Sequence, residues 1–184
     1  FGVLAVTNIC SVPQVEAPEL IHLLGVVRSG DGPTERVLSG VQPRTVLVLT
    51  ALRHGRPVTA DELAEVLWPE GPGRHWNGAL RGVVSKVRAF LDALGPSGPR
   101  LDNVGHGYCF TSPDMSCVDV QRAQDELEEA ERLLLGGSPQ EAAAPAQRAV
   151  RLLDAPLLPD LDGDWLDHHR ADLAQQLLRA MRLA

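Results

Sequence analysis

A clear helical pattern of apolar and polar positions lies between Arg74 and Leu91, in the sequence RHWNGALRGVVSKVRAFL. On a wheel of about 100° per residue, its aliphatic side chains fall within one narrow arc: Leu80, Val84, Val87 and Leu91. The opposite arc is polar but contains Gly78 and Gly82, each of which costs about 1 kcal/mol relative to alanine inside a helix. A solvated face does not need glycine, whereas a face that another backbone approaches closely does.

Two further helices are predicted before this one. The first has Pro43 in its opening turn, where a missing N–H costs nothing, and it ends near Gly55, which suits a left-handed cap. The second is opened by the sequence TADE, a capping box formed by Thr59 and Glu62, and it runs to Trp68.

Short β-branched runs predict strands on both sides of these helices. The runs FGVLAVTNI, LIHLLGVVRS and TERVLS precede the first helix, and residues 100–111 form a hairpin around the turn GHG. The order of strands, three helices and a hairpin is that of a winged helix-turn-helix. In that arrangement the last helix enters the major groove and the hairpin, or wing, lies along the DNA backbone.

From Val118 onward the pattern is entirely helical. The sequence SPQE predicts a capping box with Pro139 at the first helical position, and Pro145 is expected to bend or delay the helix that follows. Helix pairs of this length with alanine contacts resemble tetratricopeptide stacking. The expected fold is an α+β winged helix-turn-helix followed by an all-α tetratricopeptide-like domain. The expected divisions are residues 1–111, a linker at 112–117 and a partial helical domain at 118–184.

The net charge of −7 at pH 7 argues against a wholly basic nucleic-acid binder, but the charge is unevenly distributed. Residues 71–111 carry five basic and two acidic side chains, a net charge of +3, whereas residues 112–184 carry seven basic and fourteen acidic ones, a net charge of −7. This asymmetry indicates two modules with different partners.

Composition also limits the location of the chain and its chemistry. Cys10, Cys109 and Cys117 fit no zinc-ligand spacing, which favours reduced thiols in a cytoplasmic protein. No apolar run approaches the ~20 residues of a membrane span, and no signal peptide is visible. Because the chain begins with Phe1 and its last helix is still amphipathic at Ala184, we expect a fragment of a longer polypeptide.

The sequence contains no motif that indicates an enzyme or a bound cofactor. It contains no phosphate-binding GxxxxGK[ST] loop, no nucleophile elbow and no His-Glu zinc motif. The stretch DLDGDWLDHH invites a metal interpretation, but its glycine is fourth in the pattern and a calcium loop requires a sixth-position glycine and a late glutamate. We expect Asp164 to cap the following helix instead.

Four segments, in this order and spacing, resemble the SARP-type regulators (Streptomyces antibiotic regulatory proteins). They are VTADELAEVLW at 58–68, GALRGVVSKVRAFLDAL at 78–94, GHGYCF at 105–110 and PLLPDLDGDWLDHHRADL at 156–173. The family joins a response-regulator type winged helix to a bacterial transcriptional activation domain. The resemblance implies an activator that binds double-stranded promoter DNA through helix 74–94 and the wing at 100–111. It further implies homodimeric or tandem binding, and RNA polymerase as a partner.

The residues expected to face DNA come from the wheel and from the resemblance. They are Arg74, His75, Asn77, Gly78, Arg81, Gly82, Ser85, Lys86, Arg88, Arg100 and His106. Arg81 is the candidate for base reading, because a bidentate arginine on guanine is the commonest specific contact. Lys86 is expected to contact phosphate.

Two departures from the family pattern leave a second interpretation open. Val104 stands where an arginine often precedes the wing turn, and Val83 stands where a histidine is common. The alternative is a protein-interaction module whose winged helix no longer reads DNA.

Overall fold

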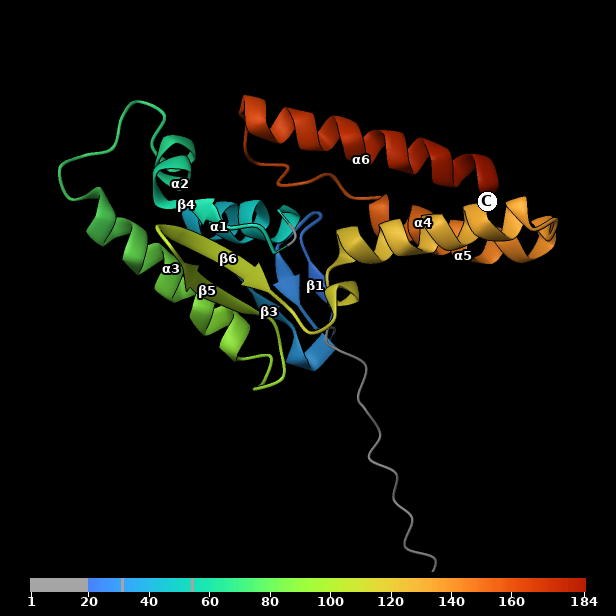
Figure 1. Cartoon of the computed structure of the whole chain (residues 1–184), viewed down its shortest axis with the longest axis horizontal. Helices are drawn as coiled ribbons and strands as arrows, with labels where there is room; N and C mark the ends of the chain where they lie inside the picture. The colour runs from blue at the N-terminus through green and yellow to red at the C-terminus, as the bar shows by residue number, and fades with distance from the viewer. Residues whose placement is uncertain (1–19, 31, 54) are drawn as a thin grey trace, which may run out of the picture.

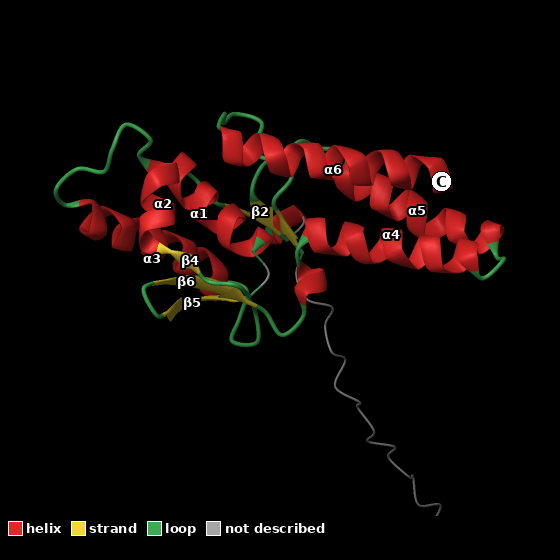
Figure 2. Ribbon diagram, turned by 45° about the horizontal axis from the view of Figure 1, so that its top comes forward, coloured by secondary structure: helices red, strands yellow, loops and turns green. Residues whose placement is uncertain are grey.

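The computed structural model describes residues 20–30, 32–53 and 55–184, and these form two small antiparallel sheets and six α-helices (Figures 1 and 2). The first sheet has the order β1 (Ile21–His22), β2 (Arg28–Ser29), β3 (Arg36–Val37). The second has the order β4 (Val58–Thr59), β6 (Gly107–Thr111), β5 (Arg100–Val104).

The first sheet differs in part from its prediction. The run FGVLAVTNI lies outside the described residues. The run LIHLLGVVRS was predicted to be one strand, and this is wrong, because it forms β1 and β2 with a turn between them. Gly25 has a φ of 71° in this turn, a left-handed conformation that reverses the chain and that glycine adopts at no steric cost. The run TERVLS supplies β3, as expected.

The winged-helix order of the N-terminal half is confirmed. Helices α1 (Val41–Leu52), α2 (Ala60–Leu67) and α3 (Trp76–Asp92) are followed by the β5–β6 hairpin. The capping box is present, with the Glu62 N–H donating to Thr59 Oγ1 at 3.1 Å and the Thr59 N–H donating to Glu62 Oε2 at 2.8 Å. The four aliphatic residues of the predicted α3 stripe are all buried.

Helix α1 was expected to be amphipathic, but it is buried on nearly every side. Only its first turn and its last residue, Leu52, reach solvent, and every residue from Thr45 to Ala51 is buried. It contacts α2, α3 and β6, so it forms the centre of the N-terminal half. The hydroxyl groups of its two buried threonines each donate to a carbonyl within the helix, from Thr45 to Val41 and from Thr50 to Val46.

The C-terminal half consists of α4 (Asp119–Leu135), α5 (Pro139–Leu153) and α6 (Asp164–Leu183). Helices α4 and α5 pack together, and α6 lies across them and extends towards α1 and α2 (Figures 1 and 2). Pro145 lies within α5 as a buried residue. Leu134, which was expected on the buried face of α4, is instead 44% exposed near the end of that helix.

Two of the predicted helix caps are wrong. Ser138 is the N-cap of α5 but its side chain makes no capping hydrogen bond, because the Glu141 N–H donates to the Ser138 backbone carbonyl at 3.1 Å. Asp164 is the first residue of α6, and the N-cap is Gly163, which has a φ of 149° and makes no side-chain cap. At both helix starts, a backbone carbonyl accepts the N–H groups that a capping side chain was expected to bind.

The two halves share one hydrophobic core. Leu80 and Val87 of α3 belong to the same buried cluster as Leu157, Leu158 and Leu166 of the C-terminal half. Isolated β-bridges also join Ile21 to Val118 and Leu24 to Leu157. The helical half is therefore packed into the winged-helix half and is not attached to it as a separate body.

A buried carboxylate lies at this junction. Asp119 opens α4 with 1% of its surface exposed, and its Oδ2 accepts the N–H groups of Leu23 and Leu24 at 2.9 and 3.0 Å. Burial raises the pKa of Asp119 to about 6, while the backbone donors and the charge of Arg28 oppose this rise. The carboxylate satisfies two N–H groups of the segment after β1 that no strand partner covers.

The raised pKa of Asp119 predicts a specific pH dependence of stability. Because the folded protein binds this proton more tightly than the unfolded chain, the stability that the group contributes is present at low pH and lost as pH rises through about 6. The unfolding free energy of the wild type minus that of Asp119→Asn should increase by about 1 kcal/mol from pH 7 to pH 5. Urea unfolding of both proteins measures this difference, and a constant value would contradict the assignment.

Candidate nucleic-acid interface

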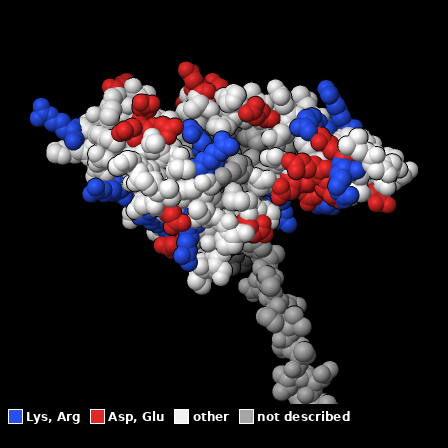
Figure 3. All heavy atoms as spheres, viewed as in Figure 1, with Lys and Arg blue, Asp and Glu red and all other residues white. Residues whose placement is uncertain are grey.

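One face of α3 carries most of the residues expected to meet DNA. Within α3, the exposed residues expected to meet DNA are Asn77, Gly78, Arg81, Gly82, Ser85 and Lys86. Arg74 and His75 are also exposed, but they lie in the turn that precedes the helix, because α3 begins at Trp76 and not at Arg74 as predicted. Lys and Arg side chains lie along the part of the surface that α3 and the wing occupy, whereas acidic side chains gather over α4 and α5 (Figure 3). The charge asymmetry of the sequence is thus an asymmetry between two regions of the surface.

The two glycines of α3 have no packing role within the chain. A Cβ atom added to Gly78 or to Gly82 would meet no other atom within 4 Å. Both residues are helical and exposed, so neither a left-handed conformation nor a close internal contact requires glycine there. Their effect is to keep a strip of helix backbone uncovered on the outer face.

Arg88 connects α3 to the wing. Its Nε donates to Leu101 O at 2.8 Å and its Nη2 donates to Asn103 Oδ1 at 3.0 Å. Strand β5 is an edge strand of its sheet, so this guanidinium satisfies a carbonyl group that no neighbouring strand covers. Arg88 was expected to face DNA, and in this structure it is half-buried and engaged with β5.

The two other residues expected on the wing, Arg100 and His106, lie at opposite ends of strand β5. Arg100 begins β5, at the end opposite the wing turn, and its Nη2 donates to Pro96 O at 2.7 Å. His106 is exposed in the turn itself, and its carbonyl accepts the N–H of Ala60 at 3.0 Å, which connects the turn to the start of α2. Only His106 therefore lies at the tip of the wing.

A hollow between α3 and the wing contains residues that sequence reasoning missed. It is lined by Arg81, Val84, Arg88, Asn103 and Tyr108. Asn103 and Tyr108 are direct partners across the β5–β6 pair, so both project from the same part of the hairpin. The register of the hairpin was the signal for this pairing, since a two-residue turn places the residues on either side of it opposite one another.

Comparison with known proteins finds matches for most of the chain. Residues 118–184 match the model of the bacterial transcriptional activator domain family. The chain is 29% identical over 92% of its length to the regulatory protein AfsR of Streptomyces griseus, and 30% identical over 86% to AfsR of Streptomyces coelicolor. It spans only 17% and 16% of the lengths of these relatives.

A solved structure agrees with this assignment at the level of the fold. The structure of Mycobacterium tuberculosis EmbR in complex with a low affinity phosphopeptide matches 89% of this chain and 44% of its own, with a TM-score of 0.79 and 24% identity. The chain has the architecture of a SARP-type regulator. The winged helix followed by a helical domain is the arrangement expected from the four sequence segments.

Against this SARP-type pattern, the two departures differ in structural meaning. Val83 is 7% exposed and belongs to the core, so its side chain is not on the outer face of α3. Val104 is 44% exposed at the last position of β5, directly before the wing turn. Only Val104 thus places an apolar side chain where a polar contact is expected in the family.

The acidic stretch before α6 has a structural partner. Asp160 makes a bidentate ion pair with Arg44 of α1, with Nη1 to Oδ1 at 3.0 Å and Nη2 to Oδ2 at 2.5 Å. Within the described residues, no three His, Cys, Asp or Glu side chains are grouped closely enough to hold a metal ion. Every helix among those residues is also too short or too polar to cross a membrane.

The geometry of the wing predicts the effect of one substitution. A Cβ at Gly107 would lie 2.2 Å from Val58 O and 2.8 Å from Thr59 Cα, both backbone atoms of the paired strand β4. Gly107→Ala should therefore separate β4 from β6 and lower the unfolding free energy by about 2 kcal/mol or more. Gly78→Ala is the matched control, because its Cβ enters open space and should stabilise α3 by about 1 kcal/mol. Equal effects in chemical denaturation would contradict this account.

Proposed function

We propose that this chain is the DNA-binding and activating module of a transcriptional regulator, and that it binds double-stranded promoter DNA through α3 and the wing. The observation that carries the proposal is the outer face of α3, where basic side chains flank two glycines that nothing inside the protein requires. An α-helix fits the major groove, and glycine allows its backbone to approach a sugar-phosphate chain closely.

The pairing of charges supports the proposal. Several arginines elsewhere in the chain are engaged with carboxylates, as in Arg44–Asp160, Arg148–Glu126 and Arg179–Glu131. Across the described residues, no carboxylate lies within ion-pair distance of Arg74, Arg81 or Lys86. These three side chains carry positive charge that no internal anion neutralises, which is the condition for binding phosphate.

Different residues have different roles in this proposal. Arg81, at the middle of the outer face, reads base edges, while Arg74 and Lys86 contact phosphate and set the register. The helical domain, formed by residues 118–184 with tetratricopeptide-like packing, contacts RNA polymerase. Two copies bind as a dimer or in tandem, because DNA half-sites are commonly occupied by paired modules.

A second function has one observation in its favour. Val104 is 44% exposed before the wing turn, so an apolar side chain faces solvent where an arginine is expected in the family. A protein-interaction module with a winged helix that no longer reads DNA fits this residue. The unpaired basic residues of α3 favour DNA over this alternative.

Substitution of two basic residues separates base reading from phosphate binding. Arg81→Ala should weaken binding to the preferred duplex by about 1–3 kcal/mol and reduce discrimination among sequences. Lys86→Ala should weaken binding to all sequences alike and lower the slope of log affinity against log salt by about one. Binding to a random-sequence duplex library at two salt concentrations measures both effects. Wild-type protein that enriches no sequence would favour the interaction module.

The outer glycine of α3 gives a sharper test. Gly82→Leu removes a helix-breaking residue, so the fold should be retained or stabilised by about 1 kcal/mol. The leucine side chain should nevertheless abolish binding, since it occupies the space that the DNA backbone needs. Gln175→Leu, on the exposed surface of α6, is the matched control and should bind normally. If Gly82→Leu binds its duplex with wild-type affinity, α3 does not approach DNA by this face.

A further inference from the structure

The connector between α5 and α6, residues 154–163, is built into the winged-helix half. Leu157 and Leu158 within it are fully buried in the core that α1 and α3 share. The backbone of the connector also meets the turn after β1, where the Gly25 N–H donates to Pro156 O at 2.8 Å. This connector therefore touches the winged-helix half, as do Val118 and Asp119 at the start of α4.

Arg170 of α6 holds the connector in an uncommon conformation. Its guanidinium donates to three carbonyls of the connector, those of Leu157 at 3.0 Å, Leu158 at 2.6 Å and Leu161 at 2.8 Å. Leu158 has a φ of 43°, a left-handed conformation that costs a non-glycine residue about 1 kcal/mol or more. The three hydrogen bonds fix a turn that the backbone alone would not favour.

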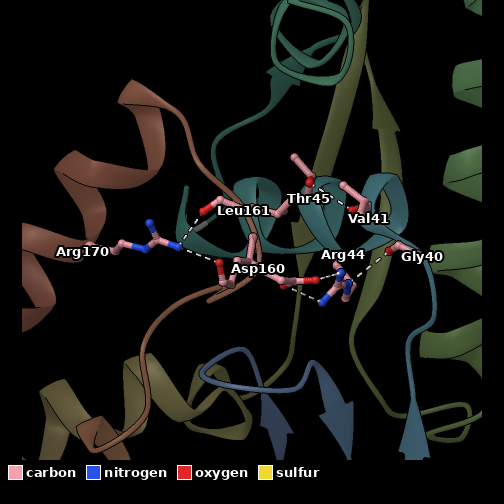
Figure 4. A network of polar contacts seen from close by, with 8 residues as sticks. Gly40, Val41, Arg44, Thr45, Asp160, Leu161 and Arg170 are labelled. Carbon is pink, nitrogen blue, oxygen red and sulfur yellow. Dashed lines mark hydrogen bonds and ion pairs between the residues drawn. The ribbon is translucent and has the colours of Figure 1, made fainter.

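The same turn presents Asp160 to α1. Asp160 pairs with both terminal nitrogens of Arg44, whose Nε also donates to Gly40 O at 3.3 Å (Figure 4). The Arg44 side chain is only 15% exposed, and its charge and hydrogen bonds hold the pKa of Asp160 below its usual range. A bidentate pair of this kind fixes an angle as well as a distance.

A continuous set of contacts therefore runs from the helical domain to the proposed DNA-binding helix. Arg170 on α6 fixes the turn, Asp160 on the turn fixes Arg44, and Arg44 belongs to α1, which packs against α3. The apolar burial of Leu157 and Leu158 stabilises the association of the two halves, but it does not specify their relative orientation. The polar contacts of Arg44, Asp160 and Arg170, together with the bonds from Leu23 and Leu24 to Asp119, supply that orientation.

We propose that Arg44, Asp160 and Arg170 are positioning residues that fix the helical domain at one angle to α3, so that a DNA-bound module presents this domain to the transcription machinery in one direction. The inference rests on the proposed function for its transcriptional consequence. The fixed angle itself can be measured without DNA.

The first experiment uses the full chain and measures a distance between the two halves that changes when the angle between them changes. Spin labels at Glu65 of α2 and Gln175 of α6, both exposed, report the distance between the halves in a Cys10→Ser background, since Cys109 and Cys117 are buried. The label-to-label distance distribution should broaden in Arg44→Met and in Asp160→Asn. The double variant should be no broader than either single variant, because all three lose the same contact. Arg148→Met, which breaks a 2.7 Å pair inside the helical domain, should leave the distribution unchanged.

The second experiment separates positioning from binding and from folding. On a promoter carrying the library-selected duplex, Arg44→Met should keep DNA affinity within about twofold and lower transcription by RNA polymerase about fivefold. An unchanged distance distribution, or DNA affinity that falls as much as transcription, would overturn the inference. If the wild type binds no duplex, the proposed function fails, while the distance measurement still decides whether these residues set the angle.

Discussion

Burial of α1 is the constraint on which the rest of this structure depends. A helix whose residues from Thr45 to Ala51 are all buried cannot be covered by one layer, so the chain has to pack around it from several directions. Helices α2 and α3 and strand β6 cover part of it, and the connector before α6 reaches it through Asp160. The winged helix and the helical domain are consequently two regions around one core.

This arrangement leaves α3 with one free face. Its inner residues, such as Leu80 and Val87, are fixed by the shared core, and Arg88 holds β5 against its side. The outer face keeps its basic side chains unpaired and its glycines uncovered, although Gly107 on the neighbouring wing is required by a close strand contact. The two kinds of glycine have opposite explanations: one is needed by the protein itself, and the other leaves room for a partner.

The negative net charge is compatible with a DNA-binding role because the acidic groups are placed elsewhere. Many of the carboxylates of α4 are paired with arginines of the same domain, as in Glu126–Arg148 and Glu131–Arg179, and this surface lies over α4 and α5 (Figure 3). Salt screens exposed charges over about 10 Å. The electrostatic interaction of α3 with phosphate therefore depends on the charges near α3 and not on the net charge of the chain. The acidic surface is then available for a different partner.

The sequence by itself determined the features that depend on neighbouring residues. The stripe of α3, the capping box of Thr59 and Glu62 and the β5–β6 hairpin each follow from interactions within a few positions of the chain, and each was predicted correctly. The predicted caps at Ser138 and Asp164 are absent because the first N–H groups of both helices donate to backbone carbonyls, those of Ser138 and Gly163, and not to a side chain. Only the tertiary structure decided that Arg88 binds the wing and that Arg44 meets Asp160, 116 residues away. No local pattern specifies such contacts, since they arise when distant segments are brought together around a common core.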